Sequence, residues 1–404
     1  AKIRLAYGES GNLTGIGAYD RFNVYAASSF NNRTSFNSNT IQVNPNLGPE
    51  RQTEIEFGID LAFLDNRINF MMNVYDKRVD DMLLDRVISP STGFSSLLDN
   101  IGNLKNTGFE MMLTGTPIQN KKFTWNVSGI FNRNRNEVLN IGSSLIQFLT
   151  NQGASVALIQ GYPVGVFYGT FFARVPGGSY STNNIGLPNH NGLVLSPAGI
   201  PRQAYGIQTS VLTYEQKDYL PGGPSGQGIP VGSTLRKIIG DPNPDYTTSL
   251  INEFSFGKWN IRIQIDATKG NDVWNGDFRT RQGAGSGKIA ELEHNGKIPR
   301  GYVSAYSPNA LFPTGLYNIE EWRIQDGSNI RLREFSASYS FGKLKNVFKD
   351  LSLSFSGRNL FVWTQYMGYD PEVNAGGQST LLRGIDFGSV PIPRTINIGF
   401  QAKF

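Results

Sequence analysis

The chain has 404 residues, of which 39% are hydrophobic and only 17% are charged. Soluble globular domains carry about 25% charged residues, so the surface is too poor in charge for an ordinary soluble protein. No run of 18 apolar residues occurs, which excludes a transmembrane helix. The absence of cysteine excludes disulfide scaffolds, zinc ribbons and thiol catalysis. The net charge of +5 is dispersed, without the basic run expected of a nucleic-acid-binding surface.

Segments that alternate apolar and polar residues predict eleven β-strands. Between Trp259 and Thr268 the odd positions are apolar and the even positions are polar. This period of two gives a strand one apolar face and one polar face. The predicted strands, in chain order, are residues 2–9, 19–28, 51–63, 67–79, 107–117, 122–136, 244–257, 259–269, 329–341, 351–363 and 394–404.

The predicted strands are long, and the connections between them are sorted by length. Strands that cross a bilayer at a tilt have about 9–11 residues, whereas soluble strands average about 5–6. Tight turns such as 64–67 alternate with long connections, the largest of which span residues 138–243 and 270–328. Outer-membrane barrels combine short periplasmic turns with long extracellular loops. We therefore expect an all-β fold, a transmembrane antiparallel β-barrel. A large soluble sandwich or propeller is the alternative, but it would not sort its loops in this way.

Strand direction bears on whether the barrel is complete. If the short turns are periplasmic, the first and last of eleven strands run in the same direction and cannot pair as antiparallel neighbours, whereas such barrels usually have an even number of strands. The first residues, Ala1 to Arg4, contain neither an initiating Met nor a signal sequence. We expect the chain to be the C-terminal part of a larger barrel.

Short motifs occur in a fixed order along nearly the whole chain. Residues 3–12 read IRLAYGESGN, residues 44–50 read NPNLGPE, and residues 240–246 read GDPNPDY. Further motifs are NLKNTGFE at 103–110, RLRE at 331–334, GRNLF at 357–361, GYDPE at 368–372 and PRT at 393–395. Together these motifs resemble those of the SusC/RagA family of TonB-dependent outer-membrane transporters.

The resemblance implies that residues 1–404 form the C-terminal half of a 22-stranded plugged barrel in the outer membrane of a Gram-negative bacterium. The implied partners are an N-terminal barrel half with its plug, a SusD-like surface lipoprotein, the TonB complex reached through an N-terminal region absent from this chain, and outer-membrane lipid. The implied function is energised import of an oligosaccharide or peptide. A passive porin or a surface adhesin barrel is the alternative. No nucleic-acid partner is expected.

Aromatic residues in the predicted loops are candidate contacts for a substrate. An aromatic ring offers a large apolar area with a polar edge, which suits sugars and peptide side chains. The candidates are Trp274, Tyr302, Tyr306, Tyr366 and Tyr369, with Trp322 in the same set. Packing between loops or against the lipoprotein is the alternative for each of them. The terminal Phe404, which closes an alternating strand, resembles the signal read by the barrel-assembly machinery.

Polar residues on the predicted strands are expected to face the lumen. Arg262, Gln264 and Asp266 alternate with apolar neighbours and are expected to contact the plug. For Arg331 and Arg333, hydrogen bonds to the plug and ion pairs inside the barrel are equally consistent with the sequence.

Catalysis is not expected. His190 and His294 are the only histidines, both lie in the longest predicted loops, and no G-x-S-x-G motif occurs. A zinc site requires His or Cys clusters, so we expect no metal, no cofactor and no enzyme activity. A barrel hydrolase that depends on one of the histidines is a third alternative. Gly283–Lys288 lacks the spacing of a phosphate-binding loop and is interpreted as a flexible loop.

Overall fold

The computed structural model describes most of the chain at the level of individual elements. The described residues are 1–13, 15–17, 19, 21–22, 25–38, 40–142, 145–149, 155–196, 198–204, 235–303, 315–343, 347–377, 379 and 381–403. Tyr306 and Phe404, named above as candidates, lie outside them. None of the helices within these ranges is long and apolar enough to cross a membrane.

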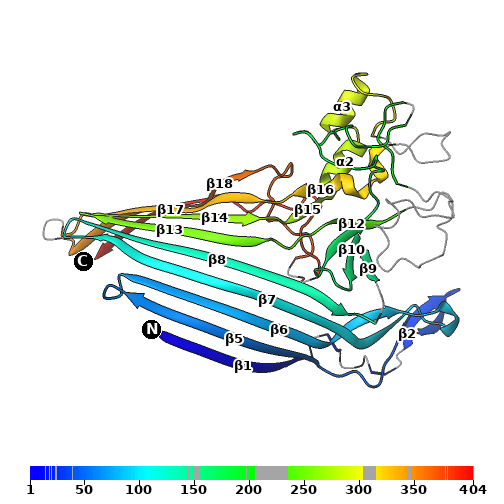
Figure 1. The fold of residues 1–404 in the computed structure, drawn as a ribbon, viewed down its shortest axis with the longest axis horizontal. Coiled ribbons are helices and arrows are strands. Elements are labelled where there is room, and N and C mark those ends of the chain that lie inside the picture. Colours follow the sequence, from blue (N-terminus) through cyan, green and yellow to red (C-terminus); the bar gives the residue numbers. More distant parts are fainter. Residues whose placement is uncertain are drawn as a thin grey trace.

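A wall of long antiparallel strands dominates the fold (Figure 1). Its strands are β1 (Lys2–Asn12), β5 (Glu50–Phe63), β6 (Ile68–Val87), β7 (Ser96–Gln119), β8 (Phe123–Asn140), β13 (Tyr246–Phe256), β14 (Trp259–Lys269), β17 (Asn329–Ser340), β18 (Asp350–Thr364) and β20 (Thr395–Lys403). Each strand pairs with the next in this order, which confirms the expected all-β, up-and-down barrel architecture. Among the described residues β1 and β20 do not pair with each other, so the barrel is open.

The register of the wall aligns the apolar residues of successive strands on one face. Leu5 of β1 lies opposite Phe57 of β5, which lies opposite Val74 of β6. These side chains are exposed, whereas a soluble protein buries most of its large apolar side chains. An exposed apolar band of this kind matches the lipid-facing side of a membrane barrel, and the opposite, polar face matches its lumen.

The short turns and the long connections lie at opposite ends of the wall, as predicted (Figure 1). In the turn between β5 and β6, Leu64, Asp65 and Asn66 all adopt left-handed φ angles. In the turn between β13 and β14, Gly257 has φ of +60°, a conformation that glycine adopts at little cost. Both chain ends lie at the short-turn end (Figure 1).

The strand predicted at residues 19–28 is wrong. Tyr25–Phe30 (β2) pairs instead with Arg33–Ser38 (β3) in a separate hairpin. The sheet does contain eleven strands, but the additional one is the two-residue β4 (Ile41–Gln42), which pairs with β7. Consequently β1 begins and β20 ends at the short-turn end (Figure 1), so the two strands run in opposite directions. The argument that strand direction prevents closure therefore fails.

The long connections fold into a packed layer at the other end of the wall, called the loop layer below. Its elements are β9 (Leu145–Leu149), β10 (Ser155–Ile159), β11 (Val166–Gly169), β12 (Lys237–Gly240), β15 (Asp272–Asn275), α2 (Gly276–Gly283), α3 (Lys288–His294), β16 (Ile324–Asp326), β19 (Ile385–Asp386) and short 3-10 turns at Leu316–Asn318 and Glu320–Arg323. A further 3-10 turn, Pro90–Thr92, lies in the connection between β6 and β7. The core of the layer includes Phe172, Phe278, Ile289, Leu316 and Trp322, each less than 9% exposed. The predicted loops thus contain a hydrophobic core of their own.

Gly283–Lys288 forms a hydrogen-bonded turn between α2 and α3, and its interpretation as a flexible segment stays a prediction. The backbone N–H groups of Ser286 and Gly287 both donate to the carbonyl of Arg281. The side chain of Gln282 accepts hydrogen bonds from the first turn of α3, at Ile289 N and Ala290 N, both at 3.1 Å. These bonds satisfy donors that a helix leaves unpaired at its start.

The loop layer contains a buried carboxyl group that makes its stability depend on pH. Burial, reinforced by the neighbouring carboxylates of Asp241 and Asp326, raises the pKa of Asp272 to about 6. The folded layer therefore holds this proton at a pH where the unfolded chain has released it. It follows that stability falls as the pH rises from about 4 to about 6 and stays lower above that range.

We expect Asp272→Asn to stabilise the loop layer at pH 7.5 by up to roughly 3 kcal/mol and to have no effect below pH 4. The amide oxygen still accepts the hydrogen bond from Asp241 N, which is 2.9 Å from the carboxylate. Hydrogen exchange of residues 272–303 at both pH values measures the difference. Glu291→Gln, which changes an exposed carboxylate of α3, is the matched control. A gain of equal size at both pH values would contradict the expectation.

Candidate functional site

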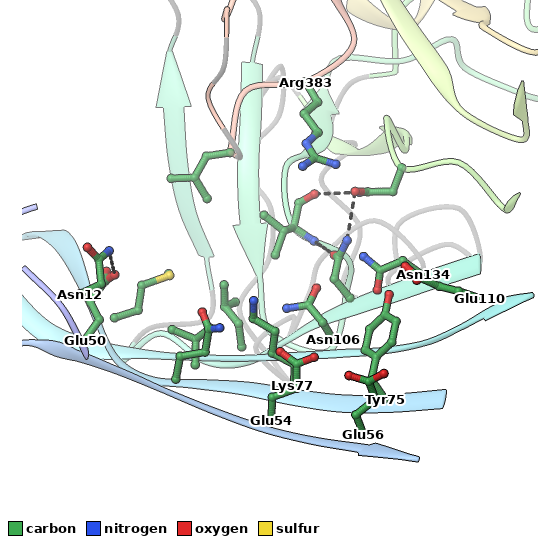
Figure 2. A pocket seen from close by; sticks show the side chains of 18 of the residues that line it. Asn12, Glu50, Glu54, Glu56, Tyr75, Lys77, Asn106, Glu110, Asn134 and Arg383 are labelled. Atoms are coloured by element: carbon green, nitrogen blue, oxygen red, sulfur yellow. Dashed lines mark hydrogen bonds between the residues drawn. The ribbon is translucent and has the colours of Figure 1, made fainter. Parts of the chain in front are cut away.

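A cavity of about 790 Å³ lies on the polar face of the wall, under the loop layer. Its floor is formed by side chains of β5, β6, β7 and β8 (Figure 2). Its ceiling includes Val164, Leu381 and Arg383, which come from two different long connections. The cavity is therefore a lumen site enclosed by wall and loops together.

The cavity carries a surplus of negative charge. Glu50, Glu54, Glu56 and Glu110 line it, against Lys77 from the wall and Arg383 from the ceiling. Figure 2 shows the arginine reaching in from the side opposite the wall glutamates. A concave surface of one predominant charge concentrates ligand groups of the opposite charge. The cavity thus favours polar groups and hydrogen-bond donors over apolar or anionic ones.

Glu50 is held in position at the edge of the cavity. One of its carboxylate oxygens accepts a hydrogen bond from the side chain of Asn12 at 2.7 Å, and the other accepts one from Leu83 N at 3.0 Å. These two bonds join β1 and β6 to the first residue of β5. The same carboxylate lines the cavity.

A chain of asparagines joins the ceiling to the wall. Asn136 of β8 donates to the side-chain oxygen of Asn243 at 3.0 Å and accepts from Val164 N at 2.6 Å. Asn243 in turn donates to the carbonyl of Val164 at 2.9 Å. The backbone N–H of Val164 is thus bonded directly to the wall, and its carbonyl is bonded through Asn243 to the same wall residue, Asn136, so this part of the ceiling is fixed relative to the wall.

The floor of the cavity depends on a glycine. Gly108 of β7 lies opposite Tyr75 of β6. A Cβ atom at this position would come within 3 Å of the tyrosine ring and of a backbone carbonyl on β8. The glycine therefore allows the Tyr75 side chain to lie across β7 and form part of the floor.

Ion pairs anchor the connection between β18 and β20, residues 365–394, to the wall. Arg331 of β17 donates to Asp370 at 2.5 Å, and both side chains are almost fully buried. Arg333 donates to Asp266 at 2.7 Å and to Glu372 at 2.8 Å. Ion pairs within the barrel, one of the two alternatives for these arginines, are therefore confirmed. Because the same connection supplies Leu381 and Arg383, the pairs also position the ceiling.

The remaining lumen-facing candidates also have partners within the chain. Arg262 pairs with Glu253 on the neighbouring strand. Gln264 donates to Asp266 at 3.0 Å. The expected contact of these residues with a plug stays a prediction.

The structure places the candidate aromatic residues in two different environments. Trp274, Tyr302 and Tyr366 are at most 6% exposed and lie in the core of the loop layer, as does Trp322. Tyr369 is 66% exposed. The burial of the first group favours the packing alternative for them. Among the candidate aromatic residues that the structure describes, Tyr369 is the one whose side chain is open to a ligand.

The two histidines belong to the loop layer. His190 Nε2 lies 2.8 Å from the hydroxyl of Tyr302, and the two rings stack. His294 is the last residue of α3. Among the described residues, no group of three or more His, Cys, Asp or Glu side chains is arranged to hold a metal ion.

The fold and the cavity define the class of the protein: a membrane β-barrel wall whose lumen is covered by folded loops. A family model described as "TonB dependent receptor-like, beta-barrel" matches residues 2–360. The chain belongs to this family, and the resemblance to the SusC/RagA transporters is confirmed.

Curated relatives match over the whole chain. TonB-dependent receptor P3 of Formosa agariphila is 27% identical over 430 residues, and the TonB-dependent receptor SusC of Bacteroides thetaiotaomicron is 24% identical over 427 residues. The chain covers 39% and 37% of these relatives, respectively. It therefore spans well under half of their length.

Solved structures share the fold. A RagAB peptide importer in an "open-open" state matches the whole chain with a TM-score of 0.70 at 19% identity, and the chain covers 40% of that protein. A "closed-closed" state gives a TM-score of 0.68 at 21% identity. The relatives in this family are receptors and transporters rather than a class of enzymes.

Proposed function

We propose that the chain is the C-terminal part of the barrel of an outer-membrane receptor that imports an oligosaccharide or a peptide. The plug, the remaining strands and the TonB-contacting segment would belong to the upstream part of the receptor, and a SusD-like lipoprotein would cover the long-loop end from outside the cell. The import would be driven through TonB. The observation that carries the proposal is the polar cavity between the wall and the loop layer in a chain that belongs to this family.

The chemistry of the cavity supports a polar substrate. Its lining is rich in carboxylate and amide groups, which bind the hydroxyls of sugars and the N–H groups of peptides equally well. The solved RagAB proteins are peptide importers, which adds support to a peptide. Tyr369 is proposed as a substrate contact at the loop layer, and Phe404 as the assembly signal.

Obstruction of the lumen tests the proposal. In the full-length receptor, Asn134→Trp introduces a bulky ring at the cavity, whereas Leu113→Trp introduces the same ring on the exposed apolar face. We expect only the first variant to reduce uptake of the growth-supporting peptide or oligosaccharide, at equal amounts of receptor in the membrane. Equal uptake by both variants would contradict a role for the cavity.

The dependence on energy separates active import from a passive pore. Uptake through the wild-type receptor is expected to stop when the proton gradient of the inner membrane is dissipated or when TonB is deleted. Uptake that continues under either condition would favour the passive porin.

A further inference from the structure

A second concave surface lies on the opposite, apolar face of the wall. It is a groove of about 520 Å³ that crosses β5, β6, β7 and β8. Two neighbouring rows of the sheet form it. The row nearer the short turns consists of Phe57, Val74, Phe109 and Arg133. The row nearer the loop layer consists of Ile55, Asp76, Thr107 and Arg135.

The floor of the groove is apolar and uncovered. Phe57, Val74 and Ile55 are 39%, 43% and 51% exposed. Phe109, which also lines the groove, stacks on Phe131 with the ring centroids 5.5 Å apart. A hydrocarbon chain, rather than a soluble molecule, fits an apolar trough on the lipid-facing side of a barrel.

The groove lies where the apolar rows of the wall are followed by rows with charged residues. Its two arginines are not fully neutralised by carboxylates of the described residues. Arg133 is exposed, and no carboxylate of the described residues lies within ion-pair distance of its guanidinium. Arg135 pairs with Asp245, a half-exposed residue. The one carboxylate in the groove, Asp76, is already shared between Arg78 at 3.5 Å and Lys105 at 3.3 Å. An anion at the groove would therefore meet Arg133 directly, share Arg135 with Asp245, and meet little opposition from Asp76.

We propose that this groove binds one phosphorylated glycolipid of the outer leaflet. Its acyl chain lies on Phe57, Val74 and Phe109, and its phosphate accepts hydrogen bonds from the guanidinium groups of Arg133 and Arg135. Arginine presents a planar fork of donors that matches phosphate geometry. The assignment of the leaflet rests on the proposed outer-membrane location with the loop layer outside the cell.

Titration of the delipidated full-length receptor with lipid A, followed by native mass spectrometry, tests the site. The probes are phosphorylated lipid A and its enzymatically dephosphorylated form. We expect the wild type to bind one phosphorylated molecule tightly and the dephosphorylated form at least about tenfold more weakly. The Arg133→Gln/Arg135→Gln variant is expected to bind both forms equally weakly. Arg51→Gln, which removes an exposed arginine paired with Asp81 outside the groove, should match the wild type.

A groove-filling variant tests the apolar floor without changing charge. Val74→Trp places a ring where the acyl chain is expected, so it should also weaken binding of phosphorylated lipid A. The gel mobility of the unheated barrel verifies that each variant is folded. Equal wild-type affinity for the two lipid forms, or unchanged affinity in either groove variant, would overturn the proposal. The assay measures lipid binding and not transport. Its result can therefore be interpreted even if the import hypothesis fails.

Discussion

The Arg331→Met variant is expected to lose about 3–5 kcal/mol of the interaction that anchors residues 365–394 to the wall. The side chains of Arg331 and Asp370 are only 3% and 4% exposed. Removal of the arginine leaves the carboxylate of Asp370 buried without a counter-charge, which is more costly than the pair itself is worth. The nearest other cation, Arg333, is already paired with Asp266 and with Glu372, the second partner of Arg331, so it cannot replace the lost guanidinium.

Hydrogen exchange of residues 365–394 in the full-length receptor measures the effect. Arg358→Met is the matched control, because Arg358 is 66% exposed and its pair with Glu334, at 3.5 Å, is expected to contribute less than about 1 kcal/mol. The double variant Arg331→Met/Asp370→Leu should recover most of the protection, since neither charge then remains buried alone. If Arg331→Met and Arg358→Met gave the same protection, the anchoring role would be refuted.

The wall strands that face lipid on one side and water on the other could be predicted almost to the residue. The prediction of 259–269 agrees with the observed strand Trp259–Lys269, and that of 51–63 with Glu50–Phe63. Such strands must alternate, because each face meets a different solvent. The prediction of 107–117 begins too late for β7, observed as Ser96–Gln119, because the first residues of that strand lie outside the alternating region.

Elements of the loop layer could not be found by the same signal. All five residues of β10, Ser155–Ile159, are buried, so the strand has no polar face and shows no period of two. The converse error occurred at the predicted strand 19–28, of which residues 25–28 belong to the hairpin β2–β3 outside the wall. Alternation of apolar and polar residues indicates that the two faces of a strand meet different environments. It does not show that one of them is a bilayer.

The candidate site was predictable only in part, for a related reason. Glu54, Glu56 and Tyr75 occupy polar-face positions of predicted strands, so their lumen orientation follows from alternation. The ceiling residues Val164 and Arg383 are separated by more than half the chain and meet through tertiary contacts that no local pattern encodes. Loop aromatics were singled out by residue type alone, which does not distinguish a buried ring from an exposed one.

Trp322→Ala is expected to destabilise the loop layer by about 3–5 kcal/mol while leaving the wall folded. Trp322 is 1% exposed, its indole N–H donates to the carbonyl of Gly186 at 2.9 Å, and its ring meets the edge of Phe278 at 5.0 Å between centroids. The truncation creates a cavity and leaves the Gly186 carbonyl without its donor. The strand ladders of the wall do not pass through this residue, so unfolding is expected to remain local.

Limited proteolysis distinguishes this structural role from substrate contact, the other role considered for the loop aromatics. Cleavage after Arg281 and Lys288 should accelerate strongly in Trp322→Ala, while the gel mobility of the unheated barrel stays unchanged. Trp322→Phe keeps most of the packing and loses only the indole hydrogen bond, so it should cost about 1–3 kcal/mol and give an intermediate rate. A buried core residue cannot be removed without loosening the layer that it holds together. If Trp322→Ala impaired uptake but was cleaved at the wild-type rate, the ring would therefore be placed at the substrate instead of in the core.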